Sequence, residues 1–171
     1  MDGEEIKKRV RAMLDESGVE YEWLDHERLF TMEDCHVVAD KLNGYVFKNL
    51  LLSNRQKTLF YIFLTDEAPF KSAAFSKALG VSRVSFVNGD DMMNLLGIVP
   101  GSVSPLALIN DTQNRVRLVI NKSILSHKRL CMHPGDSTAT VSMAADDMLK
   151  ICTRQLGHMY DIIEMPGEAK E

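Results

Sequence analysis

A seven-residue run from Val46 to Leu52, VFKNLLL, places one lysine and one asparagine inside an otherwise apolar segment. Its bulky apolar residues indicate a buried strand. An ammonium group buried without a partner is costly, because removal from water disfavours its charged form. Lys48 must therefore reach solvent at a sheet edge, pair with an acid, or bind an anionic ligand. Strand alternation predicts that Lys48 and Asn49 point to opposite faces unless a bulge intervenes.

The length of 171 residues suits one domain with one sizeable core. The N-terminus is acidic and no apolar run is long enough to span a bilayer, so we expect no signal peptide and no membrane segment. Cys35, Cys131 and Cys152 lack CxxC spacing, which indicates free thiols in a reducing compartment. We therefore expect one cytoplasmic domain over residues 1–165 and a frayed tail over 166–171.

The formal net charge of −4 argues against non-specific binding of DNA or RNA by the whole surface. Basic residues are nevertheless concentrated in one segment, at Arg115, Arg117, Lys122, Lys128 and Arg129. This segment is either a local surface for a phosphate backbone or an ordinary solvated face.

Capping residues and apolar periodicity predict helices over residues 4–16, 31–42, 69–79, 90–96 and 144–156. Strands are predicted over residues 19–25, 45–52, 58–64, 83–87, 106–110, 115–120, 129–133, 139–142 and 159–163. Two hairpins are expected, one turning at 53–56 and one joining 106–110 to 115–120. Because hairpins dominate, with helices between them, we expect an α+β domain: a mixed, largely antiparallel sheet or barrel flanked by helices. The methionine-rich segment 91–96 is either core or an interface.

The motifs of serine hydrolases, nucleotide-binding loops, zinc proteases and dinucleotide-binding folds are missing from the sequence. Three local features remain. The first is Lys48-Asn49. The second is the loop Gly101–Pro105, which could point several backbone amides at an anion or a carbonyl oxygen, or be a plain turn. The third is His133, which Pro134 biases toward an extended conformation at a strand end, where it either lines a pocket or is a satisfied structural histidine.

Taken in order, Phe47-Lys48-Asn49-Leu50, the G-x-x-x-P loop from Gly101 to Pro105 and His133-Pro134 resemble the YbaK/ProX-type aminoacyl-tRNA editing domains. The resemblance covers essentially the whole chain. The Lys-Asn-Leu pattern looks most like the free-standing deacylases that remove alanine from tRNA(Pro).

This resemblance implies hydrolysis of the ester between an amino acid and the 3′ end of tRNA(Pro), with no cofactor or metal. By this resemblance Lys48 would hold the terminal phosphate, and Asn49 would contact the aminoacyl group. The amides of Gly101, Ser102, Val103 and Ser104 would hold the scissile carbonyl, with Pro105 fixing the loop. His133 would shape the pocket, and water, assisted by a 2′-hydroxyl, would be the nucleophile. The volume set by Phe47, Leu50 and Val103 would decide whether alanine, our choice, or cysteine is removed.

Binding of tRNA would depend on a local basic surface, and we first consider Lys71, Lys77, Arg115 and Arg117. Prolyl-tRNA synthetase is a further candidate partner. The alternatives are a non-catalytic module that binds a tRNA end or a synthetase, and an unrelated small-molecule hydrolase. A Cys131–His133 nucleophile pair is also conceivable, because the two side chains share one strand face.

Overall fold

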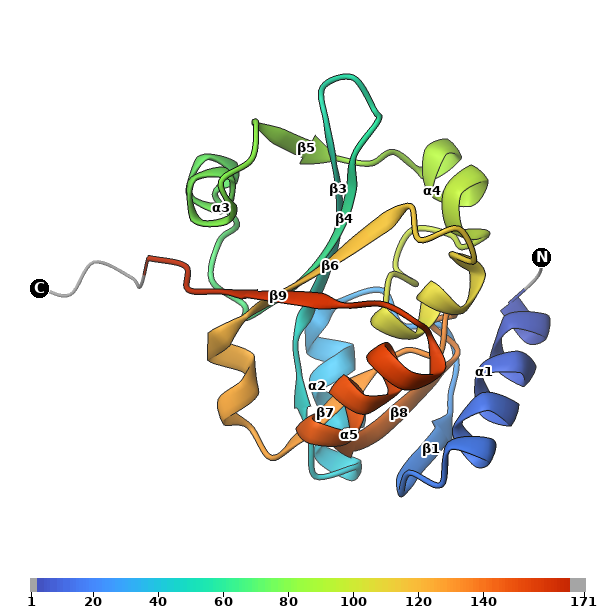
Figure 1. Ribbon diagram of the computed structural model, residues 1–171. Helices are drawn as coiled ribbons and strands as arrows, with labels where there is room; N and C mark the ends of the chain where they lie inside the picture. Colours follow the sequence, from blue (N-terminus) through green and yellow to red (C-terminus); the bar gives the residue numbers. More distant parts are fainter. Residues whose placement is uncertain (1–2, 167–171) are drawn as a thin grey trace, which may run out of the picture.

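Strands divide between two open sheets in the computed structural model, which describes residues 3–166 (Figure 1). The four-stranded sheet has the order β1 (Tyr21–Asp25), β8 (Ala139–Ala144), β7 (Arg129–Met132) and β2 (Tyr45–Val46). The five-stranded sheet has the order β5 (Val84–Phe86), β3 (Lys48–Asn54), β4 (Phe60–Thr65), β6 (Val116–Asn121) and β9 (Tyr160–Ile163). Each sheet contains parallel and antiparallel pairs, which confirms a mixed α+β fold. The sheets do not close into a barrel within these residues.

The helices are α1 (Gly3–Ser17), α2 (Met32–Lys41), α3 (Ser72–Leu79), α4 (Gly89–Leu96) and α5 (Ala145–Lys150), which continues into the π-helical turn η3 (Ile151–Gln155). Thr31 caps α2 as expected, because its hydroxyl accepts a hydrogen bond from the amide of Asp34 at 3.0 Å. The short 3₁₀ helix η2 (Lys122–Ser126) was not expected.

The chain passes from one sheet to the other at Phe47. Val46 pairs with Cys131 of β7, whereas Lys48 already pairs with Thr65 of β4. The predicted strand 45–52 is therefore two strands in different sheets. Phe47 between them is fully buried in the core that both sheets share.

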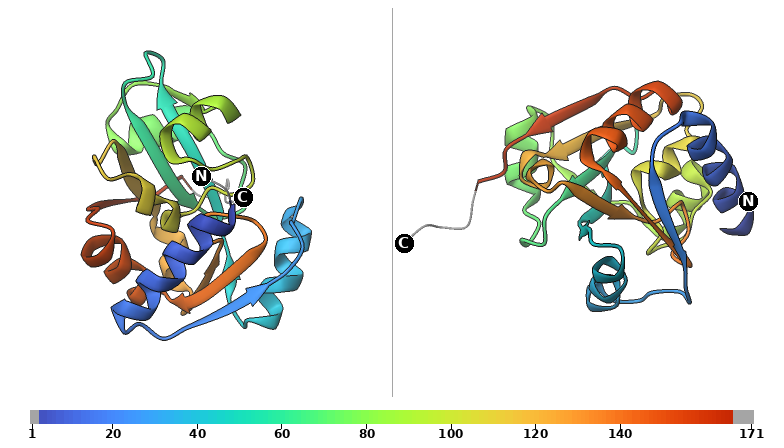
Figure 2. Two further views of the ribbon diagram at one scale, coloured as in Figure 1. Left: turned by 90° about the vertical axis from the view of Figure 1, so that its right-hand side faces the viewer. Right: turned by 90° about the horizontal axis from the view of Figure 1, so that it is seen from below.

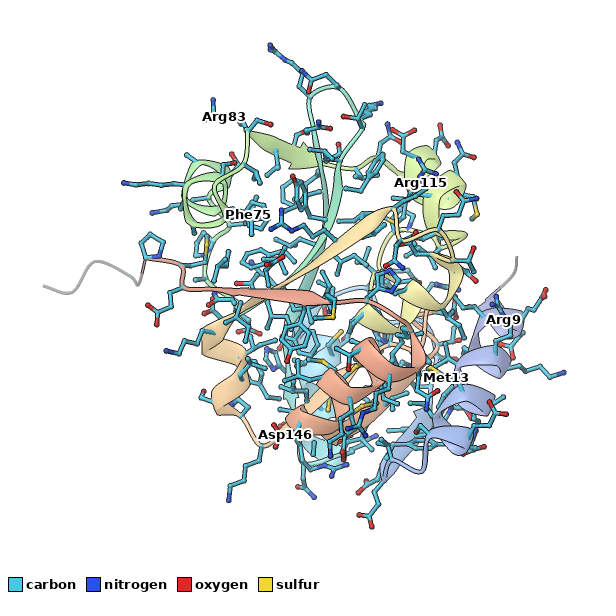
Figure 3. The ribbon with its side chains drawn as sticks, viewed as in Figure 1. Arg9, Met13, Phe75, Arg83, Arg115 and Asp146 are labelled. Carbon is cyan, nitrogen blue, oxygen red and sulfur yellow. The ribbon has the colours of Figure 1, made fainter. Side chains whose placement is uncertain are left out.

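The core lies between the two sheets, and strand alternation explains what covers their outer faces. Leu130 and Met132 of β7 point into the shared core, whereas Cys131 packs against Val38 of α2 and Leu42, the residue that follows this helix. A second apolar cluster on the five-stranded sheet packs against Phe75, which reaches from α3 toward that sheet (Figure 3). Helix α2 thus covers the four-stranded sheet and α3 covers the five-stranded one, and Figure 2 shows α2 at the periphery of the molecule.

The predicted strand 106–110, and with it the second hairpin, is wrong. This segment forms the 3₁₀ helix η1 (Pro105–Asn110), which is largely buried. Ser104 caps this helix by accepting a hydrogen bond from the amide of Leu106 at 3.1 Å, and Pro105 fixes its first residue. A short apolar run is compatible with either a strand or a buried helix, and here the Ser104 cap favours the helix.

Several smaller expectations can also be compared with the structure. Met92 and Leu96 of the methionine-rich segment belong to the core, whereas Met93 is exposed. The frayed tail predicted for 166–171 lies outside the described residues except for Pro166. No helix within residues 3–166 is long and apolar enough to cross a membrane.

Candidate functional site

The three features singled out in the sequence meet at one cavity of about 490 Å³. The cavity lies where β2 gives way to β3, between the loop at Gly101, the end of β7 and the segment that leads into α2. Its lining consists of Leu29, Phe30, Thr31, Met32, Cys35, Val46, Phe47, Lys48, Asn49, Leu50, Phe70, Phe86, Gly101, Val103, Cys131, Met132, His133 and Thr140.

Lys48 and Asn49 both line this cavity, although strict alternation would separate them. They occupy the first two positions of β3, immediately after the chain leaves the other sheet at Phe47. The crossing between sheets, like a β-bulge, therefore allows two successive side chains to face the same cavity.

The ammonium group of Lys48 donates a hydrogen bond to the carbonyl of Ala68 at 3.3 Å and forms no ion pair with any described carboxylate. The acids that follow β4 have other partners. Asp66 accepts hydrogen bonds from Ser123 and from the amide of Ala68, and Glu67 pairs with His36 of α2. Of the three possibilities for Lys48, an acid partner is thus ruled out within the described residues, whereas solvent exposure and an anionic ligand remain compatible.

Asn49 donates its amide hydrogen to the carbonyl of Phe47 at 3.2 Å, and its buried side-chain oxygen has no partner within residues 3–166. The buried hydroxyl of Ser102 is likewise unpartnered there. Nearly all buried polar atoms in proteins form hydrogen bonds, so such exceptions draw attention to a site.

The loop Gly101–Pro105 turns at Gly101, whose φ of 90° favours glycine. Gly101 and Val103 line the cavity, whereas Ser102, Ser104 and Pro105 are buried behind it. The amide of Ser102 donates to the carbonyl of Val99 at 3.0 Å and is therefore occupied. The amides of Gly101 and Val103 have no partner in the described part of the chain, which leaves them available to a ligand.

His133 follows β7 and is half-buried at the cavity wall. Its Nδ1 lies 2.8 Å from the carbonyl of Ala139. Because a carbonyl only accepts, Nδ1 carries the hydrogen, and Nε2 of the neutral ring is an open acceptor. Burial lowers the pKa of His133 from its usual value, against the opposing effect of that hydrogen bond, and favours this neutral form.

Cys131 shares the cavity wall with His133, as alternation predicted. Burial raises the pKa of its thiol to about 11, so that the thiol stays protonated near neutral pH. This protonation state disfavours the Cys–His nucleophile pair. Within residues 3–166 no group of three or more histidine, cysteine, aspartate or glutamate side chains could hold a metal ion.

Two of the four candidate tRNA-binding residues lie far from the cavity. Arg117 is paired with Asp161 at 2.8 Å, and Arg115 stacks over Phe60 (Figure 3 labels Arg115). Phe60 is at the opposite end of β4 from Thr65, the partner of Lys48, which corresponds to roughly 17 Å along a strand. Lys71, just before α3, and Lys77 within α3 are exposed.

The aromatic rim of the cavity and the part of its wall that β8 contributes were not predicted from the sequence. Phe30 and Phe86 are 82% and 62% exposed, which is high for phenylalanine, and both border the cavity with Phe70. Thr140 of β8 also lines it and was not singled out. No local signal marks these residues, because β8 and the segment before α2 approach Lys48 only through the fold.

The chain is similar in sequence to proteins of known class. Residues 26–151, which include Lys48, the loop and His133, match the family model of the aminoacyl-tRNA editing domain. The chain is 26% identical to the prolyl-tRNA editing protein ProX of Acetoanaerobium sticklandii, over 94% of this chain and 98% of that protein. It is 25% identical to the prolyl-tRNA synthetase associated domain-containing protein 1 of Danio rerio, over 85% of this chain and 80% of that protein.

Solved structures support the same fold. A crystal structure described as a candidate trans-editing enzyme for prolyl-tRNA synthetase superposes with a TM-score of 0.69, at 15% identity, covering 97% of this chain and 99% of that chain. A scaffold protein used for computational epitope grafting gives a TM-score of 0.74 at 13% identity, covering 98% and 99%.

The fold and the family match together define a single-domain α+β editing module. The chain belongs to the aminoacyl-tRNA editing domain family. It is an enzyme of the hydrolase class, a deacylase that acts on the ester of an aminoacyl-tRNA.

Proposed function

We propose that this protein is a trans-editing deacylase that removes alanine from mischarged tRNA(Pro) in the cytoplasm. The observation that supports the proposal most is the convergence of Lys48, Asn49, Gly101, Val103 and His133 on one cavity. The names of the ProX and synthetase-associated relatives support tRNA(Pro) as the substrate and prolyl-tRNA synthetase as the source of the error.

The physical need for such an enzyme follows from limited selectivity. A synthetase pocket shaped for proline cannot strongly reject a smaller amino acid, because one missing methylene changes binding by only ~1–3 kcal/mol. A second site that admits alanine and excludes proline supplies the remaining discrimination. Phe47, Leu50 and Val103 would set that limit here, and Phe47 is well suited to do so because the shared core holds its ring in place.

Each residue has a role consistent with its surroundings. Lys48, which has no acid partner, binds the phosphate of the terminal nucleotide. The amides of Gly101 and Val103 hold the scissile carbonyl oxygen and stabilise the negative charge that develops on it. Asn49 contacts the aminoacyl group, and His133 shapes the pocket and orients the substrate. Water, assisted by the 2′-hydroxyl of the terminal ribose, attacks the carbonyl carbon and the tRNA hydroxyl leaves.

The buried part of the loop has a supporting role. Ser102 and Ser104 anchor the loop below the cavity, and Pro105 starts the buried helix η1, so that the two available amides keep their direction. Lys71 and Lys77 are the better candidates for contacts with the tRNA body, because they are exposed on the α3 side and unpaired with any described acid.

The first experiment compares deacylation of alanyl-, cysteinyl- and prolyl-tRNA(Pro) by the native protein, Lys48→Ala and a matched control, Lys57→Ala. Lys57 lies in the turn between β3 and β4 and pairs with Asp91 at 2.9 Å, away from the cavity. Loss of a charge-assisted hydrogen bond to phosphate predicts a fall in kcat/KM of about 10- to 150-fold for Lys48→Ala. Lys57→Ala should retain native activity.

The possible results separate the hypotheses. Turnover of the alanyl ester alone, reduced only by Lys48→Ala, supports the proposal. Preference for the cysteinyl ester would overturn the substrate. No turnover of any ester would favour the alternative of a non-catalytic module that binds a tRNA end or the synthetase.

A further inference from the structure

At the end of the cavity between β7 and β8, neighbouring hydrogen bonds determine that two side chains act as acceptors toward a ligand. The β7–β8 register pairs Met132 with Val141, and its continuation by one residue sets His133 opposite Thr140. Both residues line the cavity. As described above, neutral His133 presents the lone pair of Nε2.

A hydrogen bond to His26 determines in the same way that the hydroxyl of Thr140 accepts from a ligand. Nδ1 of His26 lies 2.7 Å from the carbonyl of Glu27, so Nδ1 carries the hydrogen. When the ring carries this single hydrogen, Nε2 is an acceptor, 2.8 Å from the hydroxyl oxygen of Thr140. The hydroxyl of Thr140 therefore donates its only hydrogen to His26 and keeps lone pairs for a ligand in the cavity.

The charges near this wall balance each other. Asp136 accepts hydrogen bonds from Arg28 at 3.2 Å and from the hydroxyl of Thr138 at 2.5 Å. Arg28 is thus paired with Asp136, and the groups that His133 and Thr140 offer to this end of the cavity are acceptors. Such surroundings suit a donor group, and above all a small cation with several N–H bonds.

We propose that His133 and Thr140 bind the free α-ammonium group of the aminoacyl ester, and that His26 is a positioning residue that keeps Thr140 an acceptor. This assignment rests on the proposed function and extends it: the enzyme requires an unblocked amino acid. With the phosphate at Lys48 and the carbonyl at Gly101 and Val103, the ammonium is the remaining charged group of the aminoacyl ester.

The test compares alanyl-tRNA(Pro) with isobutyryl-tRNA(Pro), in which a methyl group of similar size replaces the ammonium. Rates are divided by those of uncatalysed hydrolysis, because the ammonium itself activates the ester. Loss of a charge-assisted hydrogen bond predicts that the native enzyme prefers the alanyl ester by about 10- to 100-fold. Thr140→Val and His26→Ala should each reduce this preference to a few-fold, and both Thr140→Ser and His26→Gln should restore most of it.

A matched control is Thr153→Val, which removes a hydroxyl that donates only to carbonyls of the preceding helical turn, those of Leu149 at 3.0 Å and Lys150 at 3.3 Å. It should leave the preference unchanged. Equal normalised rates for the two esters, or an undiminished preference in Thr140→Val, would overturn the inference while leaving the editing function intact. Failure of the native protein to hydrolyse alanyl-tRNA(Pro) would instead reject the proposed function itself.

Discussion

At the scale of single residues, the cavity combines one solvent-accessible cation, Lys48, with groups that their surroundings keep neutral. His133 and Cys131 occupy the same wall. Burial lowers the pKa of the His133 imidazole and raises the pKa of the Cys131 thiol, and both changes favour the uncharged form. A wall of this kind binds and orients a substrate without supplying a nucleophile. Its chemistry then depends on the loop amides and on water.

The thiol of Cys131 provides a prediction about pH. Because its pKa is raised to about 11, only about one thiol in a thousand is ionised at pH 8, and alkylation proceeds through the thiolate. We expect the folded protein to resist iodoacetamide at Cys131 at pH 8, with a rate that rises about tenfold per pH unit, whereas the urea-unfolded chain reacts readily. Peptide mass spectrometry follows this modification. Folded-state alkylation as fast as in urea would contradict the buried, protonated thiol and revive the Cys–His pair.

At the scale of elements, a buried hydrogen-bonded junction holds the turn between η1 and β6 to the segment that enters β9. The carboxylate of Asp111 accepts hydrogen bonds from the amides of Arg115 and Val116 at 2.9 and 2.8 Å. It also lies 2.8 Å from Nε2 of His158, and both side chains are almost inaccessible to solvent. This junction fixes the start of β6, the strand between β4 and β9.

Asp111→Ala should therefore destabilise the protein by about 3–5 kcal/mol, because it removes the partner of the buried Nε2 of His158 and of the amides of Arg115 and Val116. The control Arg117→Ala removes an exposed ion pair with Asp161 and should cost less than about 1 kcal/mol. Urea denaturation measures both values. Similar losses in the two variants would show that the junction is not a main source of stability.

At the scale of the whole molecule, the two sheets form one core, and we expect them to unfold together. Leu118 of β6 and Val141 of β8 belong to the same buried cluster although they lie in different sheets. The chain has one tryptophan, Trp23 in β1 of the four-stranded sheet. Its fluorescence therefore reports on the sheet that does not contain Leu118.

Leu118→Ala should cost about 2–5 kcal/mol through the cavity that it leaves. Cooperative unfolding predicts that Trp23 fluorescence and far-UV circular dichroism give the same lowered Tm. If the fluorescence transition stayed at the native temperature while circular dichroism shifted, the sheets would be independent units.

The sequence alone determined the positions of most helices, because a cap such as Thr31 bonds to an amide in the first turn of the helix that follows it. It also determined the first hairpin and the three motifs of the site, since these are local patterns of residue type. It did not predict the strand crossing at Phe47 or the helical state of 106–110. Apolar runs of that length satisfy a strand or a buried helix equally well until the rest of the chain is packed around them.

The tertiary structure decided which of the motif residues meet and what they meet. The change of sheets at Phe47 turned both Lys48 and Asn49 into the cavity, and the β7–β8 register brought Thr140 beside His133. It also moved Arg115 and Arg117 to the far end of the sheet. Residue types are a property of the sequence, but a pocket is made of groups distant along the chain, and only the pairing of strands and the packing of the core set the distances between them.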